Sequence, residues 1–126
     1  MACKVLVVDD EPYMHRLLQH HLERAGFQML DAYNGREALE LAGRDLPNLI
    51  VMDVMMAEMD GLSALKQLKK DNATKAIPVV MITASMHQIT RQEAELSGAA
   101  LFLTKPFSPT QLLSAMRTLV PETGKA

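Results

Sequence analysis

The 126-residue sequence has little cysteine and no excess of positive charge. Cys3 is the single cysteine, so no disulfide can form within the chain, which fits a reducing compartment. Lysine and arginine number 13 and aspartate and glutamate number 15, which gives a formal net charge of −2. Because stand-alone nucleic-acid binders attract phosphate with a surplus of basic residues, we expect no direct nucleic-acid binding by this chain.

Long apolar segments are also lacking. The first apolar run reaches Asp9 and Asp10 too early for a secretory signal peptide, and later runs are interrupted by Asp53 or Pro78. None approaches the roughly 20 apolar residues that a membrane-spanning helix needs. We therefore expect a cytoplasmic protein that makes no contact with a membrane.

What the sequence does contain is a regular alternation of short apolar runs and segments with helical periodicity. Strands are expected over residues 4–8, 27–32, 49–52, 77–82 and 100–103. Helices are expected from Pro12 to a stop at Gly26, over 38–42 up to Gly43, between Gly61 and Asp71, and over 88–96 and 112–120. Five successive strand–helix units predict a single-domain α/β fold in which helices cover both faces of a parallel sheet. This domain is expected over residues 1–120, with a C-terminal tail or linker stub over 121–126.

Three histidines fall within the first expected helix. His15, His20 and His21 do not show the i, i+4 spacing that would place two metal ligands on one helix face. The apolar face of this helix includes His21 next to Leu18 and Leu22. We therefore expect His21 to be partly buried, and His15 and His20 to lie at the surface.

Polar side chains follow the expected strands at the point where each strand ends. In a parallel α/β sheet, ligands bind beyond the carboxyl ends of the strands, so these residues are the candidates for a functional site. They are Asp9, Asp10, Glu11, Asp53, Thr83 and Lys105. Carboxylates about 4 Å apart repel each other by a few kcal/mol, so Asp9, Asp10 and Asp53 require a cation. Mg²⁺ with Lys105 as a second positive charge would meet this need and would suit phosphoryl transfer, with one carboxylate as the nucleophile.

Nucleotide cofactors are disfavoured by the same residues. The loop after the first strand reads Asp9, Asp10, Glu11, Pro12, which would repel a phosphate that no cation bridges. The sequence contains neither Gly-x-Gly-x-x-Gly nor Gly-Lys-Ser/Thr, the glycine-rich patterns whose backbone N–H groups bind phosphates. Binding of NAD, FMN or a nucleoside triphosphate is therefore not expected.

Four separated motifs now identify a family resemblance. Residues 7–12 (VVDDEP), 53–61 (DVMMAEMDG), 81–84 (MITA) and 102–107 (FLTKPF) resemble the receiver domain of two-component response regulators. The resemblance covers essentially the whole chain. It implies a flavodoxin-like three-layer sandwich with five (βα) units and strand order 2-1-3-4-5. It also implies that a sensor histidine kinase or a histidine phosphotransfer protein donates a phosphoryl group to an aspartate.

The resemblance assigns roles to the strand-end residues. Asp53 resembles the phosphoacceptor, and Lys105 the group that binds the phosphoryl oxygens. Asp10 resembles a direct Mg²⁺ ligand, Asp9 a water-mediated one, and Met55 a ligand through its backbone carbonyl. With Asp53 they form the expected metal site.

A conformational switch is implied as well. Thr83 would move its hydroxyl onto the phosphate, and Phe102 would turn into the space that Thr83 leaves. The face formed by the fourth helix, the fifth strand and the fifth helix would then bind a downstream protein. The Lys105–Pro106 bond resembles the cis peptide of the family.

The sequence also departs from the family pattern. Ala57 stands where a proline is common, so the loop after Asp53 is expected to be less rigid. Met55 and Ser85 occupy two positions that influence dephosphorylation, and neither offers a carboxylate or amide to orient water. We expect slow autodephosphorylation, and self-catalysed phosphotransfer in place of turnover of small substrates.

Two other functions remain as alternatives. A phosphorylation-independent interaction module could use the same fold. The sequence nevertheless keeps Asp53 and the other site residues, which such a module could lose. The second alternative is an aspartyl-phosphate hydrolase. Such enzymes have an Asp-x-Asp pattern after the first strand, whereas Asp9 and Asp10 are adjacent here.

Overall fold

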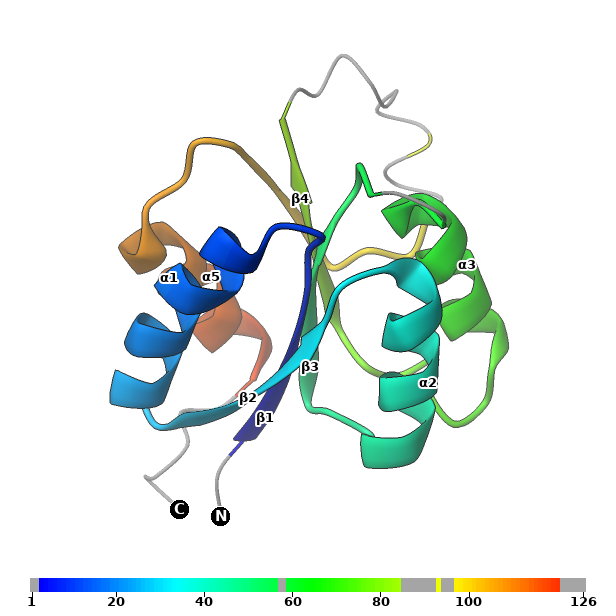
Figure 1. Cartoon of the computed structure of the whole chain (residues 1–126). Helices are drawn as coiled ribbons and strands as arrows, with labels where there is room; N and C mark the ends of the chain where they lie inside the picture. Colours follow the sequence, from blue (N-terminus) through cyan, green and yellow to red (C-terminus); the bar gives the residue numbers. More distant parts are fainter. Residues whose placement is uncertain (1–2, 57–58, 85–92, 94–96, 121–126) are drawn as a thin grey trace.

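A computed structural model describes residues 3–56, 59–84, 93 and 97–120. Five strands form one parallel sheet in the order β2-β1-β3-β4-β5, which confirms the expected topology (Figure 1). The strands are β1 (Cys3–Val8), β2 (Phe27–Ala32), β3 (Leu49–Asp53), β4 (Val79–Thr83) and β5 (Leu101–Thr104). The predicted α/β sandwich is therefore correct.

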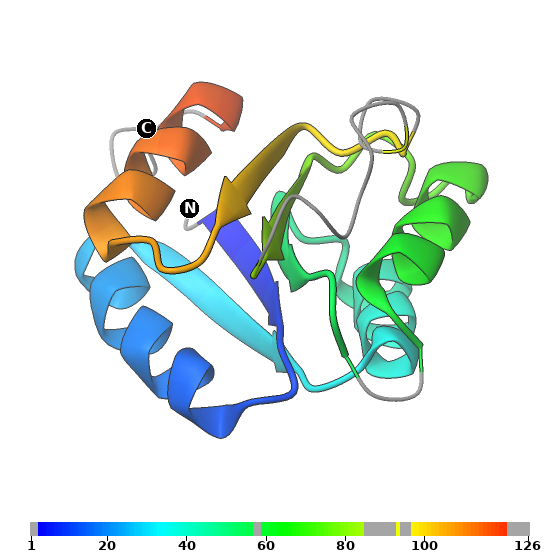
Figure 2. The same ribbon diagram turned by 90° about the horizontal axis from the view of Figure 1, so that it is seen from above.

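Four helices cover the sheet in the described part of the chain. They are α1 (Pro12–Arg24), α2 (Gly35–Asp45), α3 (Gly61–Lys70) and α5 (Pro109–Leu119). Helices α1 and α5 lie on one face of the sheet, and α2 and α3 lie on the other (Figure 2). The helix expected over 88–96, apart from the single residue Glu93, and the tail over 121–126 fall outside the described residues. None of the described helices has the length and apolar character needed to cross a membrane.

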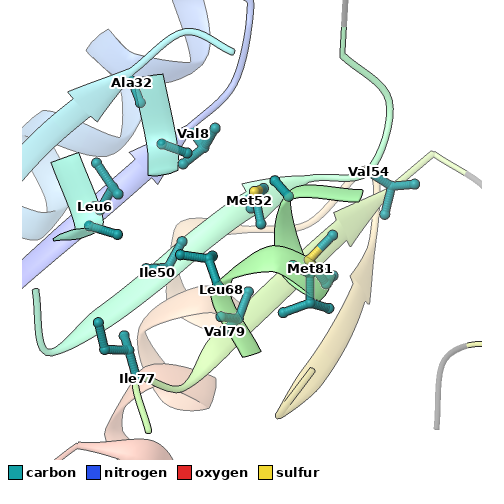
Figure 3. Packing of buried hydrophobic residues seen from close by; sticks show 14 residues of the cluster. Leu6, Val8, Ala32, Ile50, Met52, Val54, Leu68, Ile77, Val79 and Met81 are labelled. Carbon is teal, nitrogen blue, oxygen red and sulfur yellow. The ribbon is translucent and has the colours of Figure 1, made fainter. Parts of the chain in front are cut away.

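Two buried clusters hold the layers together, one on each face of the sheet. Because successive strand residues point to opposite faces, Leu6 and Val8 pack toward α2 and α3, while Val5 and Val7 pack toward α1 and α5. Figure 3 shows the first cluster, in which Leu68 of α3 lies among strand side chains. Full burial of one such aliphatic side chain stabilises the fold by about 1.5–3 kcal/mol. The continuous apolar runs of the sequence follow from this two-sided burial.

Local signals begin the helices directly after the loops at the carboxyl edge of the sheet. Pro12 occupies the first turn of α1, where its missing N–H costs no hydrogen bond. The Asp60 carboxylate accepts a hydrogen bond from the Ser63 N–H and caps α3. Ser108 caps α5 in a reciprocal capping box. These caps set where each loop ends and so limit the positions open to the site residues.

Several boundaries differ from the sequence predictions by one to three residues, and two of these differences have a clear physical cause. Helix α2 does not stop at Gly43 but continues to Asp45, and Leu46 ends it in a left-handed conformation with φ 46°. Gly43 is tolerated in the last turns of the helix, so its presence did not mark a terminus. Strand β4 starts at Val79 instead of Ile77, because Pro78 has no N–H to donate to a neighbouring strand.

Candidate functional site

Side chains from the ends of three strands meet at the carboxyl edge of the sheet, which is the upper edge in Figure 1. Asp9 follows β1, Asp53 ends β3, and Lys105 follows β5. Lys105 Nζ lies 2.7 Å from Asp53 Oδ2 and 3.8 Å from Asp9 Oδ2. The sheet thus places one ammonium group between two carboxylates that are 44 positions apart in the sequence (53 − 9).

The Asp53 carboxylate is fixed by the backbone around it. Its Oδ1 accepts a hydrogen bond of 2.9 Å from the Met55 N–H, and its Oδ2 accepts the bond from Lys105. The next residue, Val54, donates its N–H to Ile82 of β4 and accepts a bond from the Gly61 N–H at the start of α3. Asp53 is only 6% exposed. Its carboxylate therefore has one defined orientation toward the loops.

Lys105 is held in its charged form by its neighbours. Burial by itself lowers the pKa of this amine. The hydrogen bond to Asp53 and the attraction of Asp53, Asp9 and Glu11 outweigh burial, so the pKa of Lys105 lies above its usual value. The Lys105–Pro106 peptide bond is cis, as the resemblance implied.

The Asp9 carboxylate is in a less favourable environment. Burial raises its pKa most strongly, and the charge of Asp53 raises it further. The N–H of Glu11, which donates to Asp9 Oδ1 at 2.9 Å, and the charge of Lys105 act in the opposite direction. The net result is a pKa of about 6 for Asp9. One ammonium group therefore does not fully compensate the two carboxylates, and a further cation would favour their ionised forms.

These donors fit a hard divalent cation. No group of three or more His, Cys, Asp or Glu side chains is arranged around a metal position in the described part of the chain. Mg²⁺ often binds through one or two carboxylates and keeps several waters, so Asp9 and Asp53 form a sufficient side-chain set. Asp10 and Met55 are exposed beside them. The predicted ligand roles of all four residues stay predictions.

The expected switch residues lie on one side of the site. Thr83 ends β4 and is fully buried, one residue beyond Ile82, which is the register partner of Asp53. Phe102 of β5 is opposite Met81, so Phe102 and Thr83 point to the same face of the sheet. Phe102 is partly buried against the core cluster on the α2 and α3 side. Their switching roles are not tested by this arrangement.

His15 corrects one prediction from the sequence. It is buried, at 4% exposure, and not at the surface. Its Nδ1 lies 2.6 Å from Asp31 Oδ1 of β2, and its Nε2 lies 2.7 Å from the backbone oxygen of Asp9. A usable signal existed, because His15 is three residues before Leu18 and seven before Leu22, which are both buried on the same helix face. The prediction for His21, which is half-buried, is correct.

A groove of about 400 Å³ opens beside Lys105. Its walls come from the start of α1 and from the segments after β4 and β5, namely Glu11, Tyr13, Met14, Leu17, Ala84, Lys105, Pro106 and Phe107. Tyr13 is 59% exposed at this groove. The groove gives the Lys105 side of the site room for another molecule.

Comparison with known proteins identifies the arrangement. Residues 5–117 match the model of the response regulator receiver domain. The chain belongs to the response regulator receiver family. The receiver is similar to the response regulator PleD of Caulobacter vibrioides, at 42% identity over 119 residues that cover 94% of this chain and 26% of that protein. It is also similar to the alkaline phosphatase synthesis transcriptional regulatory protein PhoP of Bacillus subtilis, at 38% identity covering 95% and 49%.

Solved structures show the same receiver fold. The chemotaxis response regulator CheY4 of Vibrio cholerae aligns with a TM-score of 0.87 and 33% identity, covering 95% of this chain and all of that one. The receiver domain of the Francisella response regulator 1452 aligns with a TM-score of 0.83 and 35% identity, covering 93% and 95%. In contrast, the chain spans only between about a quarter and half the length of the sequence relatives named above.

Proposed function

We propose that this receiver is a phosphorylation-controlled signalling switch in which Asp53 accepts the phosphoryl group. The ion pair between Lys105 Nζ and Asp53 Oδ2 carries this proposal. It places a charged amine beside a buried carboxylate that faces the loops, which is the arrangement needed to bind a phosphoryl group as it reaches the nucleophile. Family membership supports the same assignment.

The proposed donor is a phosphohistidine of a sensor histidine kinase or a phosphotransfer protein. A carboxylate oxygen of Asp53 attacks phosphorus, the phosphorus–nitrogen bond of the donor breaks, and the departing imidazole takes up a proton. Lys105 then binds the phosphoryl oxygens, and the Met55 N–H continues to orient the carboxyl group. The groove beside Lys105 offers the room through which the donor side chain would approach.

Mg²⁺ is the proposed cofactor, and it would neutralise charge on the acidic cluster and on the transferred phosphoryl group. Asp10, Asp9, Asp53 and the backbone carbonyl of Met55 would hold it. The raised pKa of Asp9 supports this assignment, because burial and the charge of Asp53 disfavour its ionised form, which a bound cation would favour.

The proposed output is a change in the face that includes β5 and α5. Thr83 is buried at the end of β4 and would turn toward a phosphoryl group on Asp53. Phe102, on the same sheet face, would then move inward and alter the surface around β5. A downstream protein would bind one of the two states more tightly.

The test is to incubate the protein with Mg²⁺ and acetyl phosphate and to measure its intact mass. We expect one added phosphoryl group that is absent from the Asp53→Asn variant and absent when EDTA replaces Mg²⁺. A folded protein that binds Mg²⁺ yet gains no phosphoryl group would favour a phosphorylation-independent interaction module. Turnover of a phosphomonoester such as p-nitrophenyl phosphate would favour a hydrolase.

A further inference from the structure

His15 links the acidic cluster to β2, an edge strand of the sheet. Its ring lies between Asp31 of β2 and the backbone oxygen of Asp9, at 2.6 and 2.7 Å. The ring also lies against Tyr33, with centroids 4.2 Å apart. Both ring nitrogens face oxygen acceptors, whereas a histidine that only filled space would need neither contact. In the described part of the chain, no buried side-chain nitrogen or oxygen lacks a hydrogen-bond partner.

The contact with Asp9 is made to its backbone and not to its carboxylate. The Asp9 N–H donates to the Ala32 oxygen at 3.2 Å, and the Asp9 oxygen faces His15 Nε2. The Asp9 backbone is thus held by hydrogen bonds at both its N–H and its carbonyl oxygen. Its side chain then projects to Oδ positions that receive the Glu11 N–H at 2.9 Å and face Lys105 at 3.8 Å. Any rotation of the Asp9 backbone would move the carboxylate away from Asp53 and Lys105.

We propose that His15, oriented by Asp31, is a positioning residue that holds the Asp9 backbone so that the Asp9 carboxylate faces the cation site. This proposal rests on the proposed function, because it assigns to Asp9 a part in binding Mg²⁺. Residues that orient metal ligands commonly change metal affinity 10- to 100-fold when they are replaced. We expect an effect of about tenfold or more on the Mg²⁺ affinity when the His15 donor to Asp9 is removed.

Two amide substitutions separate the two contacts of the ring. In His15→Gln, the longer side chain places an amide N–H near the former Nε2 position, toward the Asp9 oxygen. In His15→Asn, the shorter side chain places it near the former Nδ1 position, toward Asp31. Both variants lose the ring and its contact with Tyr33, so each serves as the control for the other.

The measurement is Mg²⁺ binding to the full chain by isothermal titration calorimetry at one fixed pH, with urea unfolding of each variant alongside. We expect His15→Gln to bind Mg²⁺ within about threefold of wild type and His15→Asn to bind about tenfold or more weakly, at similar unfolding free energies. Equal Mg²⁺ affinity of the two variants would overturn the positioning role. If wild type itself bound no Mg²⁺, the proposed function would fail together with this inference.

Asp31 provides a second test that does not depend on the folding of the His15 variants. Its side chain is 41% exposed, so its replacement removes little buried surface from Asp31 itself. Asp31→Asn keeps an oxygen acceptor for Nδ1, and Asp31→Ala removes it. We expect the alanine variant to bind Mg²⁺ severalfold more weakly than the asparagine variant. Equal affinities would show that Asp31 does not orient the ring and would overturn the proposal.

Discussion

Lys105 and Asp53, 52 positions apart in the sequence, form an ion pair of 2.7 Å at the carboxyl edge of the sheet. Neither residue is on a flexible surface arm, because Asp53 ends a central strand and Lys105 follows an edge strand. Asp9 approaches the same ammonium group from a third strand end.

Removing the amine of Lys105 should disable phosphorylation. In Lys105→Met, the phosphoryl oxygens lose their bound ammonium group, so we expect the rate of labelling by acetyl phosphate to fall about 100-fold or more. The rate is measured by intact mass over time at saturating Mg²⁺. Lys66→Met, at an exposed position of α3, is the matched control. A Lys105→Met rate equal to that of the control would contradict the role of Lys105.

The raised pKa of Asp9 predicts a pH-dependent stability in metal-free buffer. Native Asp9 keeps its proton up to about pH 6, whereas the ordinary value is 3.8. The native state therefore binds more protons in this window, and the contribution of Asp9 to the unfolding free energy falls as pH rises from about 4 to 6. The unfolding free energy of Asp9→Asn should exceed that of wild type by roughly 2 to 3 kcal/mol at pH 7, and by little near pH 3.5.

Urea unfolding of wild type and Asp9→Asn, measured at both pH values, checks the Asp9 prediction. Glu40→Gln, which removes an exposed carboxyl group, serves as the control for loss of one negative charge. A stability gain in Asp9→Asn that is the same at both pH values would show that Asp9 ionisation does not destabilise the native state.

Mg²⁺ should stabilise the folded chain through the same carboxylates. A ligand that binds only the native state raises the unfolding free energy by about 1.4 kcal/mol at roughly ten times its Kd. We expect this gain in wild type at pH 7 and its loss in Asp53→Asn, measured by thermal unfolding with MgCl₂ or EDTA. NaCl at equal ionic strength controls for ionic effects. An equal gain in Asp53→Asn would place the ion elsewhere.

Gly61 should tolerate no side chain. A Cβ atom there would collide with the Asp53 backbone oxygen and lie 2.9 Å from Met81 Cε. Gly61→Ala must shift the start of α3 or the end of β3, so we expect a loss of about 1–3 kcal/mol in stability and slower phosphorylation. Gly43→Ala is the control, since a Cβ there meets nothing within 4 Å and should stabilise α2 by about 0.5–1 kcal/mol. Equal stabilities of the two variants would contradict the prediction.

The acyl phosphate on Asp53 should decay slowly, because the exposed Met55 side chain cannot orient a water molecule. A carboxylate or amide at this position could do so, and we expect Met55→Glu and Met55→Asn to shorten the lifetime severalfold. The lifetime is followed by mass after removal of acetyl phosphate. Met55→Leu, which changes shape but adds no polar group, is the control. Identical decay in all four proteins would assign no role to this position. Ser85, the other position named from the sequence, lies outside the described residues.

Local chemistry made much of this fold predictable from the sequence. The bounds of β2 at Phe27–Ala32 were predicted correctly, and Pro12 marks the start of a helix in the structure as it does in the sequence. The strand-end rule predicts that Asp9, Asp53 and Lys105 lie in one region, and the structure brings them together. Gly43 was misread, because glycine can either end a helix or be tolerated within it, and only the conformation of Leu46 distinguishes the two.

The sequence by itself therefore determined the alternation of strands and helices, the two-sided burial of the sheet and the set of charged residues at its edge. These depend on periodicity and on residue type, which a linear chain displays. The tertiary structure decided which charges make contact and which histidine is buried. His15 is enclosed because β2 brings Asp31 beside α1 and β1 brings the Asp9 backbone to its other nitrogen. Such a pairing depends on distances between elements, which the order of residues alone does not contain.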